Sequence, residues 1–90
     1  MTPDELLRLY PRETVRWLRG RLGLSQEALA AQLGVSPFTV AGYETGRQGV
    51  RVVRIRRRLV ALLAPHLATP AGAAFARSLG RGEAAHDRGA

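Results

Sequence analysis

Apolar residues recur at helical spacing along most of the chain, in short runs that begin and end at helix-start and helix-stop signals. Thr2 and Glu5 have the spacing of a capping box and precede a leucine-rich stretch, so a short helix is predicted there, ended by Pro11. Pro11 in turn opens a second helix that stops at Gly23. Gly20 lies inside this second helix and weakens it by about 1 kcal/mol relative to alanine.

The same signals predict two more short helices and a longer one. Ser25 is the expected cap of a third helix, whose apolar residues fall on one face and which Gly34 ends. Ser36 caps a fourth helix, which begins with a proline at its first position. A longer helix with a leucine-rich stripe is predicted over residues 51–66.

A final helix is predicted from Thr69 to Gly80. Residues 81–90 have no apolar periodicity and are predicted to be disordered. The pattern contains no strand signal and no internal repeat. The predicted fold class is therefore all-α, a compact bundle of about five short helices with an extra short N-terminal helix, forming one domain over residues 1–80.

Composition agrees with a small folded domain. A chain of 90 residues has room for one modest core, and a hydrophobic fraction of 46% is that of a globular protein. No apolar run approaches the roughly 20 residues of a membrane span, and the start of the chain does not resemble a signal peptide. The sequence has no cysteine, which agrees with a reducing compartment. A cytoplasmic location is therefore expected.

Charge narrows the choice of partners. The formal net charge is +7 and the isoelectric point is about 11.6, which favours nucleic acid, an acidic partner or a membrane surface. All 14 lysine and arginine positions are arginine. Codon bias is one explanation, and phosphate binding is the other, because a guanidinium binds phosphate through two parallel hydrogen bonds. The stretch between Gly46 and Val60 contains no acid and carries Arg47, Arg51, Arg54, Arg56, Arg57 and Arg58.

The segment LSQEALAAQLGVSPFTVAGYETGR, residues 24–47, has the spacing of a helix-turn-helix. A small residue is needed where the two helices cross, a glycine in the turn, and two apolar residues on the inner face of the second helix; these are Ala30, Gly34, Val40 and Tyr43. The segment resembles the DNA-binding domains of the Cro and phage-repressor (Xre-type) helix-turn-helix family. The resemblance covers Arg12 to Leu63 and implies a lambda-repressor-like domain whose core we place at residues 12–67.

The resemblance implies that residues 36–46 form the recognition helix, which enters the major groove of double-stranded DNA. The family places base-reading side chains at positions that match Pro37, Phe38, Thr39 and Gly42. Helical geometry also turns Phe38, Ala41, Gly42 and Thr45 away from Val40 and Tyr43. None of these side chains can form two hydrogen bonds to a base. Base recognition would then depend on contact of Phe38 with a thymine methyl, on Thr39, and on a small surface at Ala41 and Gly42. A protein-binding face and a hydrophobic staple are the alternatives for Phe38.

Phosphate contacts are assigned from the resemblance and from charge. Helix starts at Gln26 and Ser36 match positions where the family contacts the DNA backbone. The residues after the recognition helix that are expected to reach flanking phosphates are Thr45, Arg47, Arg51 and Arg54. Plain capping is the alternative for Ser36, and a solvated helix face is the alternative for the arginines at positions 56–58.

In this family an arginine on the first domain helix pairs with the glutamate near the end of the recognition helix, and Arg19 and Glu44 match these positions. Such a pair would be structural, with a solvated Arg19 as the alternative. Glu44 has no second carboxylate, histidine or nucleophile at a motif spacing, and no phosphate-binding loop or zinc spacing is present. We therefore expect no enzymatic activity, no metal and no cofactor.

A second apolar stripe on the long predicted helix, Val53, Val60 and Leu67, requires cover. The candidates are the final helix around Phe75, the N-terminal region around Trp17, or a second subunit. Because helix-turn-helix modules commonly bind two half-sites as dimers, a homodimer is one of the expected states.

The leading functional interpretation is a sequence-specific transcriptional regulator of the repressor or Cro type. Two alternatives come from other classes: an antitoxin-like or adaptor module that holds a protein partner such as a toxin, and an accessory DNA-binding subunit of a phage or mobile-element complex. Fold resemblance alone does not separate them.

Overall fold

The computed structural model describes residues 1–80, and the tail predicted to be disordered, residues 81–90, lies outside the described residues. Within residues 1–80 the chain forms six helices and no strand. They are α1 (Pro3–Leu9), α2 (Pro11–Leu22), α3 (Gln26–Leu33), α4 (Pro37–Thr45), α5 (Val53–Leu67) and α6 (Pro70–Gly80). The prediction of an all-α bundle with an additional N-terminal helix is confirmed.

The predicted capping signals operate at the helix ends. The Thr2 hydroxyl accepts the Glu5 amide N–H at 3.1 Å, and the Glu5 carboxylate accepts the Thr2 amide N–H at 2.8 Å, which completes the capping box. The Ser25 hydroxyl accepts the Ala28 amide N–H at 3.0 Å. Gly23 ends α2 with a left-handed backbone at φ 67°. The starts of α1 and α3 and the end of α2 therefore lie where local chemistry favours them.

The predicted start of the long helix is wrong. The helix was expected over residues 51–66 but begins at Val53 and ends at Leu67. The chain is extended just before it, with Val52 at φ −72° and ψ 119°. Val50 is buried in the core, so the connection from α4 must reach inward before α5 can start. Tertiary packing sets this boundary, because no side chain caps the start of α5.

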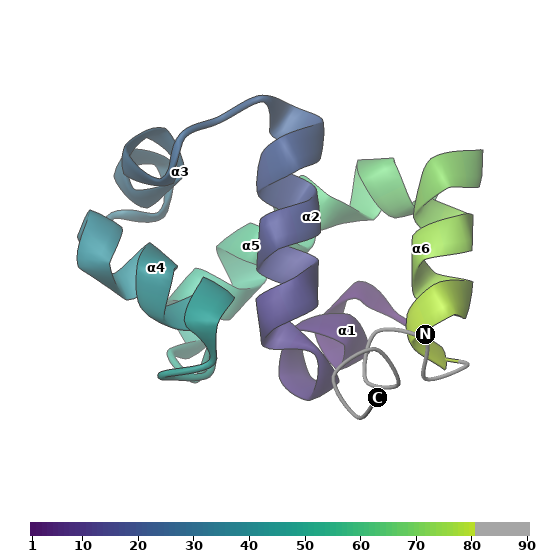
Figure 1. Cartoon of the computed structure of the whole chain (residues 1–90), viewed down its shortest axis with the longest axis horizontal. Helices are drawn as coiled ribbons and strands as arrows, with labels where there is room; N and C mark the ends of the chain where they lie inside the picture. Colours follow the sequence, from purple (N-terminus) through teal and green to yellow (C-terminus); the bar gives the residue numbers. More distant parts are fainter. Residues whose placement is uncertain (81–90) are drawn as a thin grey trace.

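Figure 1 shows α2 at the centre, with α3 and α4 on one side of it and α6 on the other. The core joins the inner faces of α1 to α5 and consists of Leu7, Val15, Leu18, Leu29, Ala30, Leu33, Val40, Tyr43, Val50, Ile55, Leu59 and Leu63. A domain of this size depends on such a shared core, since no single helix of it is stable alone.

The second apolar stripe of α5 is covered mainly from within the chain. Val60 and Leu67 are partly buried and pack against the core, whereas Val53 remains 47% exposed. Both α1 and α6 pack against α5. The rings of Trp17 and Phe75 stack with their centroids 4.6 Å apart and so fix α6 to α2.

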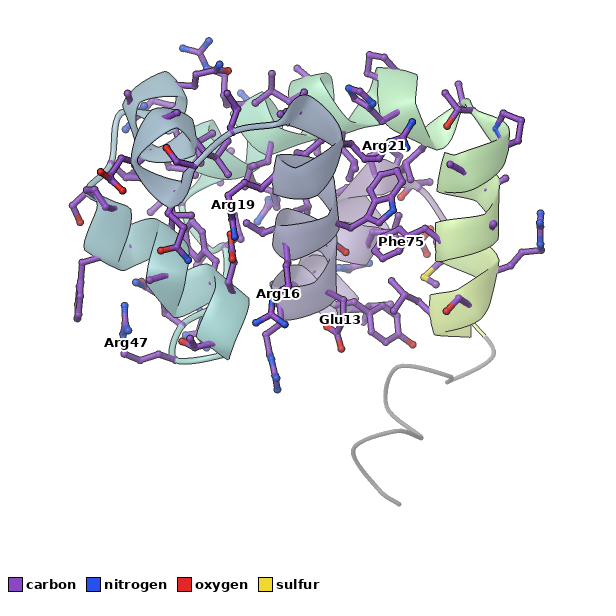
Figure 2. All side chains as sticks on the ribbon, turned by 45° about the horizontal axis from the view of Figure 1, so that its top comes forward. Glu13, Arg16, Arg19, Arg21, Arg47 and Phe75 are labelled. Carbon is purple, nitrogen blue, oxygen red and sulfur yellow. The ribbon has the colours of Figure 1, made fainter. Side chains whose placement is uncertain are left out.

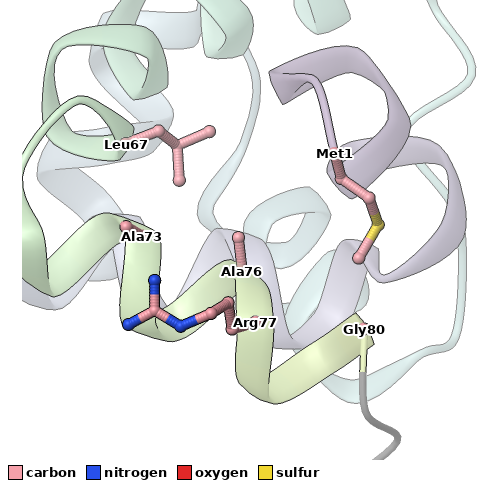
Figure 3. Close-up of a pocket in the computed structure, with 6 residues that line it drawn as sticks. All are labelled: Met1, Leu67, Ala73, Ala76, Arg77 and Gly80. Atoms are coloured by element: carbon pink, nitrogen blue, oxygen red, sulfur yellow. The ribbon is translucent and has the colours of Figure 1, made fainter.

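An open pocket lies beside α6. A hollow of about 660 Å³ lies between α6, the end of α5 and the N-terminus (Figure 3). Helix α6 stands on the side of α2 away from α3 and α4 (Figure 1). No single helix within residues 1–80 is long and apolar enough to cross a membrane. Helices α5 and α6 together have the length and composition of a membrane span, but the chain bends by 112° between them.

Candidate nucleic-acid interface

Helices α3 and α4 form a helix-turn-helix. Ala30 is buried where the two helices cross, and Gly34 makes the turn with a left-handed backbone at φ 72°. Val40 and Tyr43 are buried on the inner face of α4, and burial raises the pKa of the Tyr43 phenol. Helix α2 packs against α4 as well. The second helix is thus held from behind, with its other side facing outward.

The first residues of α4 are exposed. Pro37 is exposed, and Phe38 has 69% of its surface accessible, the largest exposure of any large apolar residue within residues 1–80. Thr39 is half-buried, and its hydroxyl lies 3.1 Å from that of Ser36. The Ser36 hydroxyl also accepts the Thr39 amide N–H at 3.2 Å. Capping by Ser36 is therefore present, on a helix start that faces solvent.

Gly42 was expected to lie at the exposed surface of α4, and this expectation is wrong. The residue is buried even though it belongs to the outward side of α4. A Cβ at this position would contact Nη2 of Arg47 and would lie 2.7 Å from Nε2 of Gln48. The loop after α4 curls back over the helix, because the Gln48 amide N–H donates to the Gly42 carbonyl at 3.3 Å. Helical periodicity could not predict a cover supplied by the following loop.

The Arg47 side chain folds back over α4. Its Nη2 donates to the Phe38 carbonyl at 2.6 Å, and its guanidinium carbon lies 3.8 Å from the centre of the Phe38 ring. Figure 2 shows the Arg47 side chain beside α4. Gly46 allows this return with a left-handed backbone at φ 81°. This position of Arg47 was not predicted from the sequence, where the glycines at positions 42 and 46 are the signal for it.

The remaining predicted phosphate contacts surround α4. The Gln26 amide is half-buried and donates to the Glu44 carboxylate at 3.3 Å. The Thr45 hydroxyl donates to the Gly42 carbonyl at 3.4 Å. Arg51 and Arg54 are exposed, and Nη1 of Arg54 lies 3.6 Å from the point where a Cβ on Gly34 would be. The Arg54 guanidinium is therefore beside the turn of the helix-turn-helix.

The arginines of α5 divide into two groups. The Arg56 Nε lies 2.9 Å from the Asp4 carboxylate, so this residue joins α5 to α1. For Arg56 the expected alternatives were a solvated position and a contact with DNA, and the ion pair with Asp4 differs from both. Arg57 and Arg58 are exposed.

The predicted ion pair between Arg19 and Glu44 is present and is close to bidentate. Nε of Arg19 lies 2.7 Å from Oε2 of Glu44, and Nη2 lies 3.0 Å from Oε1. Nη1 of Arg19 donates to the Leu24 carbonyl at 3.1 Å, and Nη2 of Arg16 donates to the Glu44 carbonyl at 3.0 Å. The Glu44 residue is 2% exposed. Its hydrogen bonds raise the pKa of the Arg19 guanidinium, and the pair ties α2 to α4. Figure 2 shows Arg19 between these two helices.

These features define a helix-turn-helix domain with its second helix at the surface. A family described as the helix-turn-helix domain matches residues 12–73. The chain belongs to this family, which agrees with the resemblance to Cro and phage-repressor domains. No curated protein and no solved structure matches the chain. Family membership indicates a DNA-binding regulator, and proteins of this family are typically not enzymes.

Proposed function

We propose that the protein is a sequence-specific transcriptional regulator of the repressor or Cro type, which places α4 in the major groove of double-stranded DNA. The observation that carries this proposal is an outward helix-turn-helix flanked by arginines in a stretch without acids. The exposed start of α4, with Pro37, Phe38 and Thr39, is the part that enters the groove. Phe38 contacts a thymine methyl, since its ring is apolar and exposed.

Phosphate binding comes from both sides of α4. Ser36 and Gln26 stand at helix starts, where the positive end of the helix dipole favours an anion. Thr45, Arg51 and Arg54 follow α4 and contact the flanking backbone. These contacts fix the position of α4 and carry no sequence information themselves.

The proposed biological setting follows from DNA binding. The protein acts in the cytoplasm at the nucleoid and binds as a homodimer, because two half-sites one helical turn apart, about 34 Å, match two copies of α4. Sedimentation of the free and DNA-bound protein measures this state.

A second function is favoured by the exposure of Phe38, which also suits a protein-binding face. In that case the chain is an antitoxin-like or adaptor module, or an accessory subunit of a phage or mobile-element complex. Phe38→Ala separates the two readings. For the regulator it relaxes preference at one or two base pairs containing thymine, whereas unchanged affinity for every duplex favours the protein partner.

The direct test of the proposed function is selection from a library of random duplexes with the full chain, followed by sequencing of the bound fraction. A regulator enriches one short motif, with thymine among the specified positions. A bound fraction with the composition of the starting library would overturn the proposal, because charge alone would then account for binding.

A further inference from the structure

Recognition helix α4 lacks side chains that read bases through two hydrogen bonds, yet the space above its central glycine is filled. A Cβ on Gly42 would lie 3.0 Å from the guanidinium carbon of Arg47 and 2.7 Å from the amide nitrogen of Gln48. Two polar side chains from the following loop thus occupy the place where a side chain of α4 would stand. The glycine is needed for this arrangement, because any larger residue displaces them.

Arg47 is held in a fixed position there. Its guanidinium stacks on the Phe38 ring at 3.8 Å and donates one N–H to the Phe38 carbonyl. The Gln48 backbone N–H fixes the loop to the Gly42 carbonyl at 3.3 Å. A guanidinium carries five N–H donors, and the bond to Phe38 uses one, so the remaining four include a pair that can bind an external ligand.

We propose that Arg47 is a base-reading residue that recognises guanine, supplied to α4 by the loop. The proposal rests on the proposed function, and it assigns Arg47 to a base edge instead of the flanking phosphate expected from the sequence. The planar fork of arginine matches O6 and N7 of guanine in the major groove. Because Arg47 is stacked on Phe38, the guanine lies next to the thymine whose methyl group Phe38 contacts.

Gly42→Ala tests the proposal without changing any charge. The added Cβ displaces the Arg47 guanidinium, while alanine is otherwise favoured in a helix. Gly20→Ala is the matched control, since Gly20 is an exposed helical glycine with nothing within 4 Å of an added Cβ. Arg47→Lys keeps the charge and removes the fork, and Arg47→Ala removes both.

The measurement is anisotropy titration of each variant with the selected duplex, with duplexes carrying each of the other base pairs at the guanine position, and with a random duplex. The wild type and Gly20→Ala are expected to prefer guanine by about 5- to 150-fold. Gly42→Ala, Arg47→Lys and Arg47→Ala are expected to lose that preference. For Gly42→Ala and Arg47→Lys, affinity for the random duplex is unchanged.

Two results overturn the inference in different ways. If Arg47→Ala weakens selected and random duplexes by the same factor and the guanine preference survives, Arg47 contacts a phosphate and the regulator remains. If the wild type shows no preference among duplexes, the proposed function fails together with the inference. Thermal melting of each variant confirms that it is folded, and Arg47→Lys keeps the test decisive if Arg47→Ala does not fold.

Discussion

Replacing Arg19 by alanine removes the main partner of a buried carboxylate. Glu44 is 2% exposed, and within residues 1–80 its other side-chain hydrogen bond is a longer one of 3.3 Å from Gln26. Removing one partner of a fully buried pair costs about 3–5 kcal/mol. The Arg19 side chain is 27% exposed, so solvent screens part of this interaction. We therefore expect Arg19→Ala to lower the free energy of unfolding by about 2–3 kcal/mol, which includes the lost bond to the Leu24 carbonyl.

Urea denaturation followed by circular dichroism measures this change, provided that the slope of the transition stays constant. Arg58→Ala is the control, because Arg58 is an exposed arginine on α5, and a change within about 0.5 kcal/mol is expected. Combining Arg19→Ala with Glu44→Gln gives less destabilisation than the sum of the two single changes, since the buried charge is gone. A loss below about 0.5 kcal/mol for Arg19→Ala would show that the pair contributes no more than a solvated arginine and refute this reasoning.

The remaining predictions concern glycines and phosphates. Gly20→Ala should raise stability by about 0.5–1 kcal/mol in the same denaturation assay, because Gly20 is an exposed helical position with free space around it. Gly72→Ala should lower it by about 2 kcal/mol or more, as other overpacking changes do, since a Cβ there meets the His66 carbonyl oxygen; equal free energies of unfolding for Gly20→Ala and Gly72→Ala would contradict this. Arg54→Ala should weaken binding to every duplex equally and flatten the salt dependence by roughly one unit, whereas a loss confined to one sequence would argue against a phosphate contact.

Local signals account for most of the fold. The Thr2 and Glu5 capping box, the Ser25 cap and the left-handed Gly23 and Gly34 are chemical requirements of helix ends, so the sequence predicts where α1 to α4 begin and end. The start of α5 is not set by a cap. It depends on how far the chain must run to bury Val50, which no local pattern contains.

In the candidate site, too, some contacts could be predicted from the sequence and others depend on tertiary packing. The ion pair of Arg19 with Glu44 joins residues far apart in the chain and was available only through the family resemblance. The helix-turn-helix spacing was sufficient to expose Phe38 and bury Val40. It could not place Arg47 over Gly42, because that contact requires the loop to turn back at Gly46. Pairing of Arg56 with Asp4 likewise depends on how α1 packs against α5.

A regulator of this kind requires that α4 reads a DNA sequence, and the ratio of its affinities for two duplexes measures whether it does. The affinity of the full chain for the selected duplex is compared with that for a shuffled duplex of the same composition, by fluorescence anisotropy at several salt concentrations. We expect the selected duplex to bind at least about 1,000-fold more tightly, with both affinities falling as salt rises. Equal affinities for the two duplexes at every salt concentration would show that α4 does not read a sequence.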